Sequence, residues 1–205
     1  GQREDFRLVG DILSVFDGQK LKVLDFGCYT GQLLKSLSKS FELFGVEPNV
    51  RAAQIAEQRG IKIVSQDAGK IENLDVRYDI IVTCDVIEHV PNPLDLLKQL
   101  RSRLKPGGLL LVSTGNCDAW LWRLTRARFW YCQFPEHISF IGNRWLKKMP
   151  SLAGLELEDL HRFNHRARNA SIVLTMATLM FWLSSFFDKL LKRAISKSGS
   201  QAGTP

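Results

Sequence analysis

Short apolar segments alternate with amphipathic segments between residues 22 and 113, and this alternation restricts the chain to few folds. The segments expected as strands are 22–26, 41–46, 61–64, 78–83 and 108–113, and those expected as helices are 32–37, 51–59 and 93–104. Strands separated by helices form βαβ units, whose right-handed crossovers produce a parallel sheet covered on both faces. The sequence therefore predicts an α/β fold with a doubly wound, mostly parallel sheet.

Further elements are predicted on either side of this region. Apolar residues at helical spacing over 6–16 predict a helix before the first strand, and 144–152 is expected to form a late helix. The alternating pattern of 155–160 predicts a sixth strand.

The length of 205 residues suits one α/β domain and is short for two. With 45% hydrophobic and 24% charged residues, the chain is neither wholly disordered nor collagen-like nor a coiled coil. We expect the domain to span 1–165, with 115–140 as an aromatic and basic insertion over the substrate. Residues 166–205 are expected to form a helical C-terminal extension, which consists of an apolar helix and a basic, partly disordered tail.

Glycine, acidic and other small residues follow four of the expected strands. Ligands of open parallel sheets bind beyond the carboxyl ends of the strands, so these residues are candidates for a binding site. Gly27 and Gly31 allow close approach of the backbone to a ligand. Glu47, about 20 residues later, can accept hydrogen bonds from both hydroxyls of a ribose, and Asp67 can accept one from an adenine amino group.

The dinucleotide-binding pattern GxGxxG is not matched, because Tyr29 and Gln32 stand where its second and third glycines would be. Instead the ordered segments 23–31, 46–48, 67–68, 78–81 and 104–108 resemble the class I S-adenosylmethionine-dependent methyltransferases, over residues 20–115. The resemblance implies a Rossmann-like fold, S-adenosyl-L-methionine as cofactor and methyltransferase activity.

The resemblance also implies a set of cofactor-binding residues. Gly27, Cys28 and Gly31 would line the methionine end, Glu47 the ribose, Asp67 and Ala68 the adenine, and Cys84 and Val86 its other side. The set also includes Tyr29, Pro48 and Asp25, of which Asp25 is expected to order the backbone amides of the turn. Tyr29 replaces the usual glycine of the family, which would narrow the pocket or cover the methionine moiety. Other interpretations stay open for single residues: a surface carboxylate at Glu47, a helix cap at Asp67, and buried apolar packing for the two cysteines.

Two segments indicate the class of acceptor. Residues 85–93 resemble the small-molecule branch that includes ubiquinone-pathway O-methyltransferases, and 135–140 is similar to bacterial relatives tied to glycan or lipid-linked metabolism. Methyltransferases that act on nucleobase amines carry Asn/Asp-Pro-Pro-Tyr/Phe after the fourth strand, where this chain has Cys84-Asp85-Val86-Ile87. We expect O-methylation of a small, lipophilic or sugar-containing acceptor. A non-catalytic module that regulates a partner and an RNA methyltransferase are the alternatives.

Removal of a hydroxyl proton requires a base, and histidine is suited to this near neutral pH. His89 follows the fourth strand and His137 lies in the insertion, so either is the candidate base, with a structural role as the alternative for each. His161 and His165 lie in a basic stretch and are expected to face solvent. Four cysteines without metal-ligand spacing predict neither a metal site nor disulfides, which fits a cytoplasmic protein.

The formal net charge of +7 is unevenly distributed along the chain. Residues 1–100 carry a net charge of −3 and residues 101–205 carry +10. The basic half favours a phosphorylated or lipid-linked acceptor, or a membrane surface, over nucleic acid. Residues 170–195 include an apolar run flanked by basic residues, for which three interpretations stay open: a membrane-surface helix, a helix packed on the pocket or on a second subunit of a homodimer, and a seventh strand.

Overall fold

The computed structural model describes residues 3–37, 39–73, 75–126, 129, 131, 132 and 135–163. They belong to one compact unit, Gly1–His165. The predictions for 166–205, including the three interpretations of 170–195 and the orientation of His165, lie outside the described residues. Among the helices that the structure describes, none is long and apolar enough to cross a membrane.

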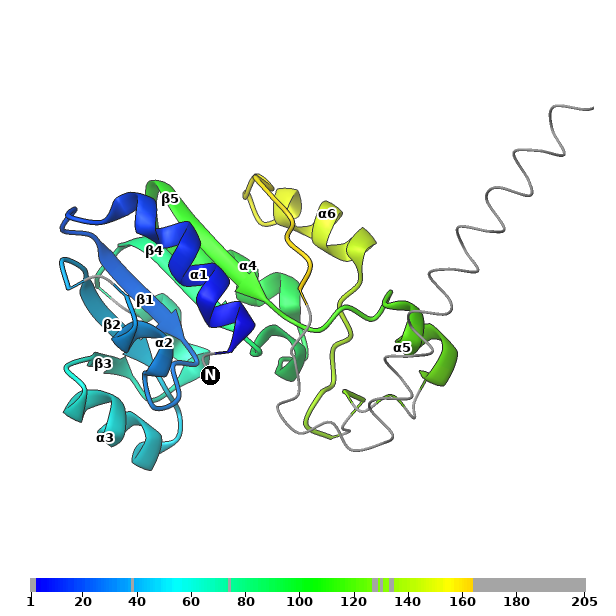
Figure 1. The fold of residues 1–205 in the computed structure, drawn as a ribbon, viewed down its shortest axis with the longest axis horizontal. Helices are drawn as coiled ribbons and strands as arrows, with labels where there is room; N and C mark the ends of the chain where they lie inside the picture. The colour runs from blue at the N-terminus through cyan, green and yellow to red at the C-terminus, as the bar shows by residue number, and fades with distance from the viewer. Residues whose placement is uncertain are drawn as a thin grey trace, which may run out of the picture. The chain divides into compact units, whose positions relative to one another are not determined.

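Five parallel strands form the central sheet, as the alternation of the sequence predicts (Figure 1). They are β1 (Lys22–Phe26), β2 (Glu42–Val46), β3 (Lys62–Ser65), β4 (Tyr78–Cys84) and β5 (Leu104–Ser113), in the order β3-β2-β1-β4-β5. The direction of strand addition reverses between β1 and β4. In doubly wound sheets, the carboxyl ends of the strands on either side of this reversal line the ligand-binding crevice.

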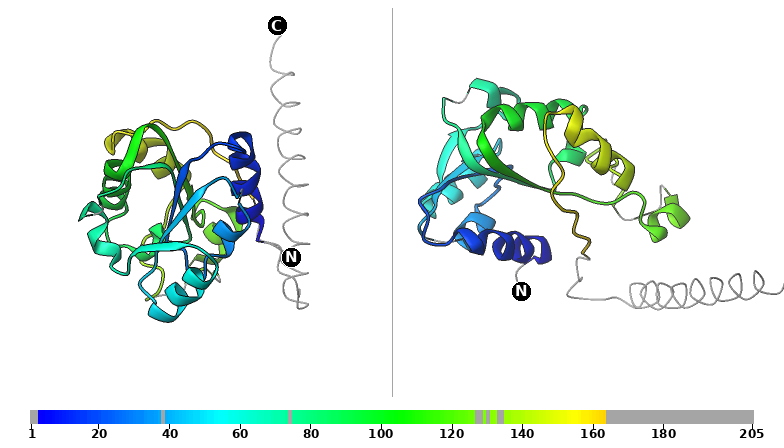
Figure 2. Two further views of the ribbon diagram at one scale, coloured as in Figure 1. Left: turned by 90° about the vertical axis from the view of Figure 1, so that its left-hand side faces the viewer. Right: turned by 90° about the horizontal axis from the view of Figure 1, so that it is seen from above.

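Helices cover both faces of the sheet, with α1 on one side and α4 and α6 on the other (Figure 2). The α-helices are α1 (Glu4–Leu13), α2 (Gln32–Lys35), α3 (Val50–Gln58), α4 (Pro93–Arg103), α5 (Trp120–Thr125) and α6 (Asn143–Leu152). Short 3-10 helices are η1 (Ser14–Phe16), η2 (Ala68–Asn73) and η3 (Ile87–His89). This arrangement confirms the doubly wound α/β fold.

The core has two parts because successive side chains of a strand point to opposite faces of the sheet. On the face of α1, Val23 and Val82 pack in one cluster with Val9 and Leu13 of that helix. On the opposite face, the second cluster contains Leu24 and Ile81 from the strands and Leu96, Leu97 and Leu100 from α4. Burial on both faces explains why these strands have nearly continuous apolar sequences.

Two predictions about strands need correction. Residues 155–160 are not a strand: Leu155 packs against the core, but Leu157 is exposed, so the alternating residues do not form one continuous buried face. The fifth strand begins at Leu104, which pairs with Tyr78 before a shift in register, and not at residue 108. The apparent turn 105–107 is thus part of the strand.

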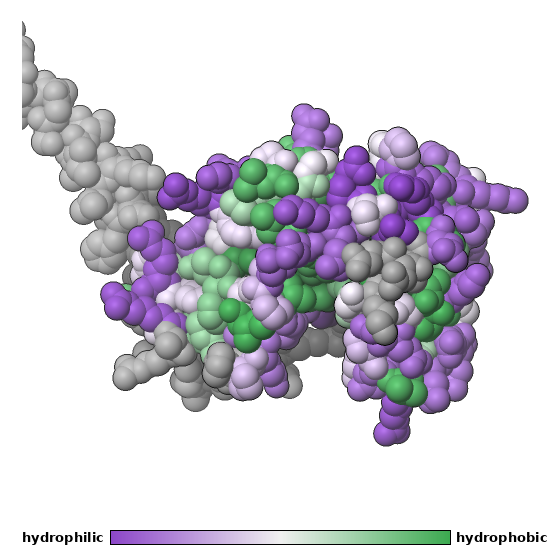
Figure 3. Space-filling model, turned by 180° about the vertical axis from the view of Figure 1, so that it is seen from behind, coloured by the Kyte–Doolittle hydropathy of each residue, from purple (hydrophilic) through white to green (hydrophobic). Residues whose placement is uncertain are grey.

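The surface of the unit is mixed in character. Seen from behind, hydrophobic side chains form patches that are interrupted by hydrophilic ones (Figure 3). In the insertion, Trp120 and Leu124 are exposed, whereas Trp122 is buried.

Candidate active site

The loop between β1 and α2 turns so tightly that it needs glycine at two positions. Gly27 and Gly31 have φ angles of +85° and +72°. A Cβ atom at Gly27 would lie 2.5 Å from Cγ2 of Val86, and one at Gly31 would lie 2.0 Å from Cδ1 of Ile61. The side chains of Val86 and Ile61 thus fill the space where a Cβ would project, so both the backbone conformation and the packing require glycine at these two positions.

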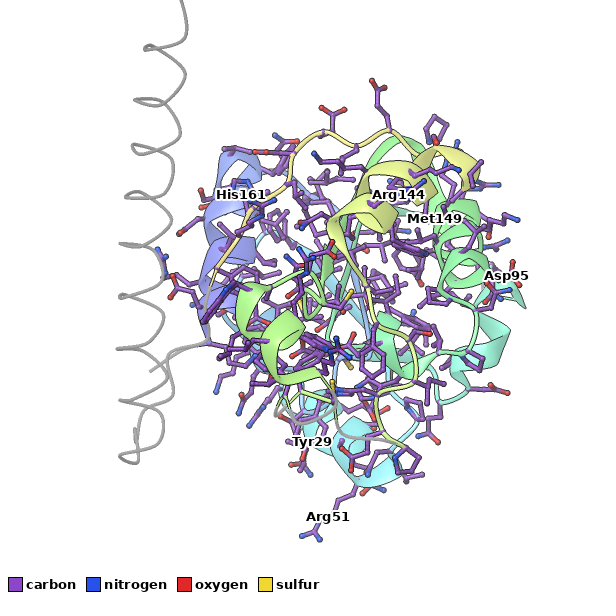
Figure 4. All side chains as sticks on the ribbon, turned by 90° about the vertical axis from the view of Figure 1, so that its right-hand side faces the viewer. Tyr29, Arg51, Asp95, Arg144, Met149 and His161 are labelled. Atoms are coloured by element: carbon purple, nitrogen blue, oxygen red, sulfur yellow. The ribbon has the colours of Figure 1, made fainter. Side chains whose placement is uncertain are left out.

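Tyr29, at the centre of this loop, is a residue other than glycine in a backbone conformation that is unfavourable for it. Its φ angle of 47° lies in the left-handed region, which disfavours residues other than glycine. Its side chain is 65% exposed, on the side of the molecule where Arg51 projects from α3 (Figure 4). The loop is also held by Arg59, whose Nη1 donates to the carbonyl oxygen of Thr30 at 2.6 Å and to its Oγ1 at 3.0 Å.

Glu47 follows β2 directly, and its carboxylate faces this loop. The residue is 7% exposed, its Oε2 accepts from the backbone N–H of Tyr29 at 2.8 Å, and its Oε1 accepts from that of Asn49 at 2.8 Å. Each carboxylate oxygen can accept a second hydrogen bond. Glu47 is therefore fixed in place and keeps acceptor capacity for a pair of hydroxyls, such as those of a ribose.

Asp25, at the end of β1, is 3% exposed. Burial, with the negative charge of Glu47, raises the pKa of its carboxyl to about 7, although the Arg3 guanidinium acts in the opposite direction. Arg3 forms ion pairs with Asp5 and with Asp85, which follows β4. Acidic side chains therefore predominate at this edge of the sheet and favour a cationic ligand. Together with the glycine loop and Glu47, this environment fits S-adenosyl-L-methionine, which carries a positive sulfonium.

The remaining predicted cofactor residues differ in how far they are buried. Cys28 and Cys84 are protonated at neutral pH, because burial raises the pKa of Cys28 to about 12 and raises that of Cys84 as well. They act as apolar packing groups and not as nucleophiles. Asp67 is exposed, and its Oδ1 accepts from the backbone N–H of Gly69 at 2.9 Å at the start of η2. Ala68 and Val86 are half-buried beside the core, and Pro48 is exposed.

The two candidate bases, separated by 48 positions in the sequence, lie together. The ring centroids of His89 and His137 are 4.7 Å apart. Nδ1 of His89 is 2.7 Å from the carbonyl oxygen of Glu136, and Nδ1 of His137 is 2.6 Å from that of Tyr131. A carbonyl oxygen only accepts, so both Nδ1 atoms carry hydrogen and each neutral ring keeps a basic Nε2. No hydrogen bond joins either Nε2 to the described residues.

Sequence reasoning missed the group that joins these histidines to the sheet. Glu88 is 1% exposed; its Oε2 accepts from Thr114 Oγ1 at 2.9 Å, and its Oε1 accepts from the Tyr131 hydroxyl. The Tyr131 and His137 rings are 4.2 Å apart. Glu88 and its neighbour in the sequence resemble an exposed polar pair. The sequence around Glu88 carries no signal of its burial. His161, by contrast, pairs with Asp159 at 3.0 Å on the surface, as expected.

Glu88, His89 and His137 each place one potential metal-ligand atom within 4.8 Å of the others. However, both Glu88 carboxylate oxygens already accept hydroxyl hydrogen bonds, and both Nδ1 atoms face carbonyl oxygens. An ion bound here would have to share each carboxylate oxygen with a hydroxyl donor. We therefore describe these residues as a hydrogen-bonded cluster.

Several aromatic residues of the insertion pack on one another. The ring of Trp122 stacks on Phe129 at 5.1 Å and contacts Tyr131 and Phe140 at centroid distances of 5.5 and 5.3 Å. These aromatic residues form a small core that supports Tyr131. Trp122 is therefore occupied by packing within the insertion.

Comparison with known proteins places this geometry in a family. Residues 2–160 match a family model described as a methyltransferase domain. The chain is 35% identical over 102 residues to a ubiquinone biosynthesis O-methyltransferase of Bradyrhizobium diazoefficiens, an alignment that covers 47% of this chain and 40% of that protein. It is 27% identical to the Coxiella burnetii protein of the same name, over 80% of this chain and 76% of that one. The chain thus spans less than half of the first of these relatives.

A solved structure from Thermotoga maritima, a methyltransferase described as a possible histamine N-methyltransferase, has a similar fold. It superposes with a TM-score of 0.56 and 23% identity, over 75% of this chain and 70% of that one. The family match, which covers most of the sequence, agrees with the parallel sheet, the glycine loop and the acidic residue after β2. The chain belongs to the methyltransferase domain family, the class I S-adenosylmethionine-dependent methyltransferases.

Proposed function

We propose that this chain transfers the methyl group of S-adenosyl-L-methionine to a hydroxyl of a small acceptor. The observation that carries the proposal is the buried Glu47 carboxylate, fixed by two backbone amides beside the glycine loop. A carboxylate in this position pairs with a ribose diol. The relatives from Bradyrhizobium and Coxiella are described as O-methyltransferases, which supports a hydroxyl as the acceptor group.

The bound donor supplies an electrophilic methyl group, so the protein has to orient the acceptor and remove its proton. In the transfer, a bond from the acceptor oxygen to the methyl carbon forms as the carbon–sulfur bond breaks. The hydroxyl proton passes to Nε2 of His137 or His89. Both rings keep this atom unprotonated when neutral, because each Nδ1–H donates to a carbonyl oxygen.

We further propose that Gly27, Gly31, Asp25 and Glu47 hold the methionine and ribose parts of the cofactor. Asp67 and Ala68 would contact the adenine, although Asp67 also caps η2. For the acceptor, the basic side chains after residue 100 favour a phosphorylated or lipid-linked molecule over nucleic acid. A membrane surface at 170–195, a homodimer and a cytoplasmic location remain parts of this proposal that rest on the sequence alone.

Calorimetry with S-adenosylhomocysteine tests the cofactor site. We expect the wild-type chain to bind and Glu47→Ala to lose measurable binding, because both backbone tethers and the diol acceptor disappear. Glu42→Ala is the matched control: it removes an exposed carboxylate at the opposite end of the same strand and should leave the affinity within about twofold. Absence of binding by the wild type, or full affinity in Glu47→Ala, would refute the proposed site.

Turnover assays then distinguish the acceptor group. S-adenosylhomocysteine release is measured with hydroxylated aromatic and sugar acceptors and with amine analogues of the same skeleton. O-methylation predicts release with the hydroxyl compounds only. Release with the amines alone would show an N-methyltransferase, and release with RNA alone would favour the nucleic-acid alternative.

A further inference from the structure

Glu88 connects the end of the sheet to the returning insertion. It belongs to η3, directly after β4, yet its carboxylate is bonded to Thr114, which follows β5, and to Tyr131 of the insertion. The Tyr131 hydroxyl also accepts from the backbone N–H of Gly115 at 3.0 Å. One buried side chain therefore joins its own segment to two others, which lie 26 and 43 positions further along the sequence.

The main chain of η3 continues this connection. The backbone N–H groups of Ile138 and Ser139 both donate to the carbonyl oxygen of Glu88 at 2.9 Å. Ser139 Oγ donates to the carbonyl oxygen of Val90 at 2.7 Å. The two residues that follow His137 are consequently attached to η3 and to the residue after it.

The position of the His137 ring follows from these contacts. Its Nδ1–H donates to the carbonyl oxygen of Tyr131, whose own hydroxyl is bonded to Glu88. Burial and the Glu88 carboxylate raise the pKa of Tyr131, so this hydroxyl keeps its proton and remains a donor at neutral pH. Glu88 thus influences the position of the His137 ring indirectly, through Tyr131.

We propose that Glu88 is a positioning residue, which, through Tyr131 and Thr114, fixes the insertion so that His137 presents its unprotonated Nε2 to the acceptor. This inference rests on the proposed function for the role of His137, but the hydrogen-bonded connection itself does not. It accounts for a carboxylate that is almost fully buried and has no ion-pair partner among the described residues. Such a group is costly unless hydrogen bonds compensate for its lost hydration.

Truncation of Glu88 would leave two partly buried hydroxyls without their acceptor and risks unfolding the chain, so the experiment changes the partners of Glu88 instead. Tyr131→Phe removes the hydroxyl that joins Glu88 to the insertion, and Thr114→Val removes the one after β5. Thr114→Ser keeps that hydroxyl and should restore wild-type behaviour. Tyr78→Phe is the matched control, because the buried Tyr78 hydroxyl has no hydrogen-bond partner in the described part of the chain.

Two readouts report the connection without an acceptor. The first is hydrogen exchange at the amides of Gly115, Ile138 and Ser139, which we expect to accelerate about tenfold in Tyr131→Phe through loss of one net hydrogen bond. The second is the imidazole tautomer of His137, read from the carbon-13 shift of its Cδ2. We expect the Nδ1–H form in the wild type and a mixture of tautomers in Tyr131→Phe.

The outcomes separate this inference from the proposed function. Unchanged exchange and an unchanged tautomer in Tyr131→Phe would overturn it, as would equal effects in Tyr78→Phe. Binding of S-adenosylhomocysteine should stay within about twofold of the wild type in all variants, and if the wild type does not bind it, the proposed function fails while the exchange data still test the connection. Stoichiometric binding of Zn²⁺ or Mg²⁺ that His137→Ala abolishes would replace this interpretation with a metal site.

Discussion

The buried carboxyl of Asp25 should make the stability of this protein fall with rising pH, and Asp25→Asn should remove that dependence. The side chain is almost completely enclosed at the end of β1. Burial, followed by repulsion from Glu47, raises the pKa of its carboxyl from 3.8 to about 7, with Arg3 opposing the shift. Asparagine has nearly the same shape and no charge to desolvate.

The sign and size follow from proton linkage. Between about pH 4 and pH 7 the folded protein binds a proton at Asp25 that the unfolded chain has lost, so the free energy of unfolding decreases as the pH rises through this window. A shift of about three units at about 1.4 kcal/mol per unit corresponds to about 4 kcal/mol, fully developed above pH 7. Asp25→Asn should therefore be more stable than the wild type at about pH 8, and this gain should vanish near pH 4.

Urea denaturation of the wild type and of Asp25→Asn, at several pH values between about 5 and 8, measures the difference directly. The gap between the two free energies should widen steadily up to about pH 7 and then remain constant. Asp17→Asn, which removes an exposed carboxyl, should follow the wild type throughout. A gap that is independent of pH would refute the reasoning. If Asp25→Asn gains stability but loses affinity for S-adenosylhomocysteine, the charged carboxyl destabilises the fold and contributes to cofactor binding.

Two further substitutions test the loop and the far end of the sheet. Gly31→Ala should destabilise the fold by more than about 3 kcal/mol in urea denaturation, because its Cβ would overlap Ile61, whereas Gly60→Ala, with a similar φ angle of +84° and open space, should cost only about 1 kcal/mol. Burial acts to raise the pKa of Asp79, but hydrogen bonds from Lys105 and a backbone amide lower it overall, so stability from this carboxylate is present above about pH 4 and lost below it. Asp79→Asn should cost about 1 kcal/mol at pH 7 and nothing near pH 2; an equal cost at both pH values would contradict this assignment.

The β-α alternation over residues 22–113 was sufficient to predict the five parallel strands and the two covered faces. The central strands β1 and β4 are buried on both faces, so their apolar runs are visible without knowledge of their neighbours. Glu47 could be found for a related reason, since its position directly after a strand places it at the carboxyl-end edge in any such sheet. The pattern failed at 155–160, where Leu157 alternates correctly but has no apolar face to join.

By itself, then, the sequence determined the layers of this protein and the edge at which a ligand would bind, because both depend on local periodicity. Only the tertiary structure decided how the hydrogen-bonded cluster around Glu88 is assembled. The chain returns across the end of the sheet after β5, and this return brings together Glu88, Thr114, Tyr131 and His137. Hydrogen bonds between loops produce no periodic pattern in the sequence, so this cluster could not be predicted from it. The sequence does not distinguish a buried glutamate from an exposed one. Whether its carboxylate can be buried depends on which distant segments donate hydrogen bonds to it.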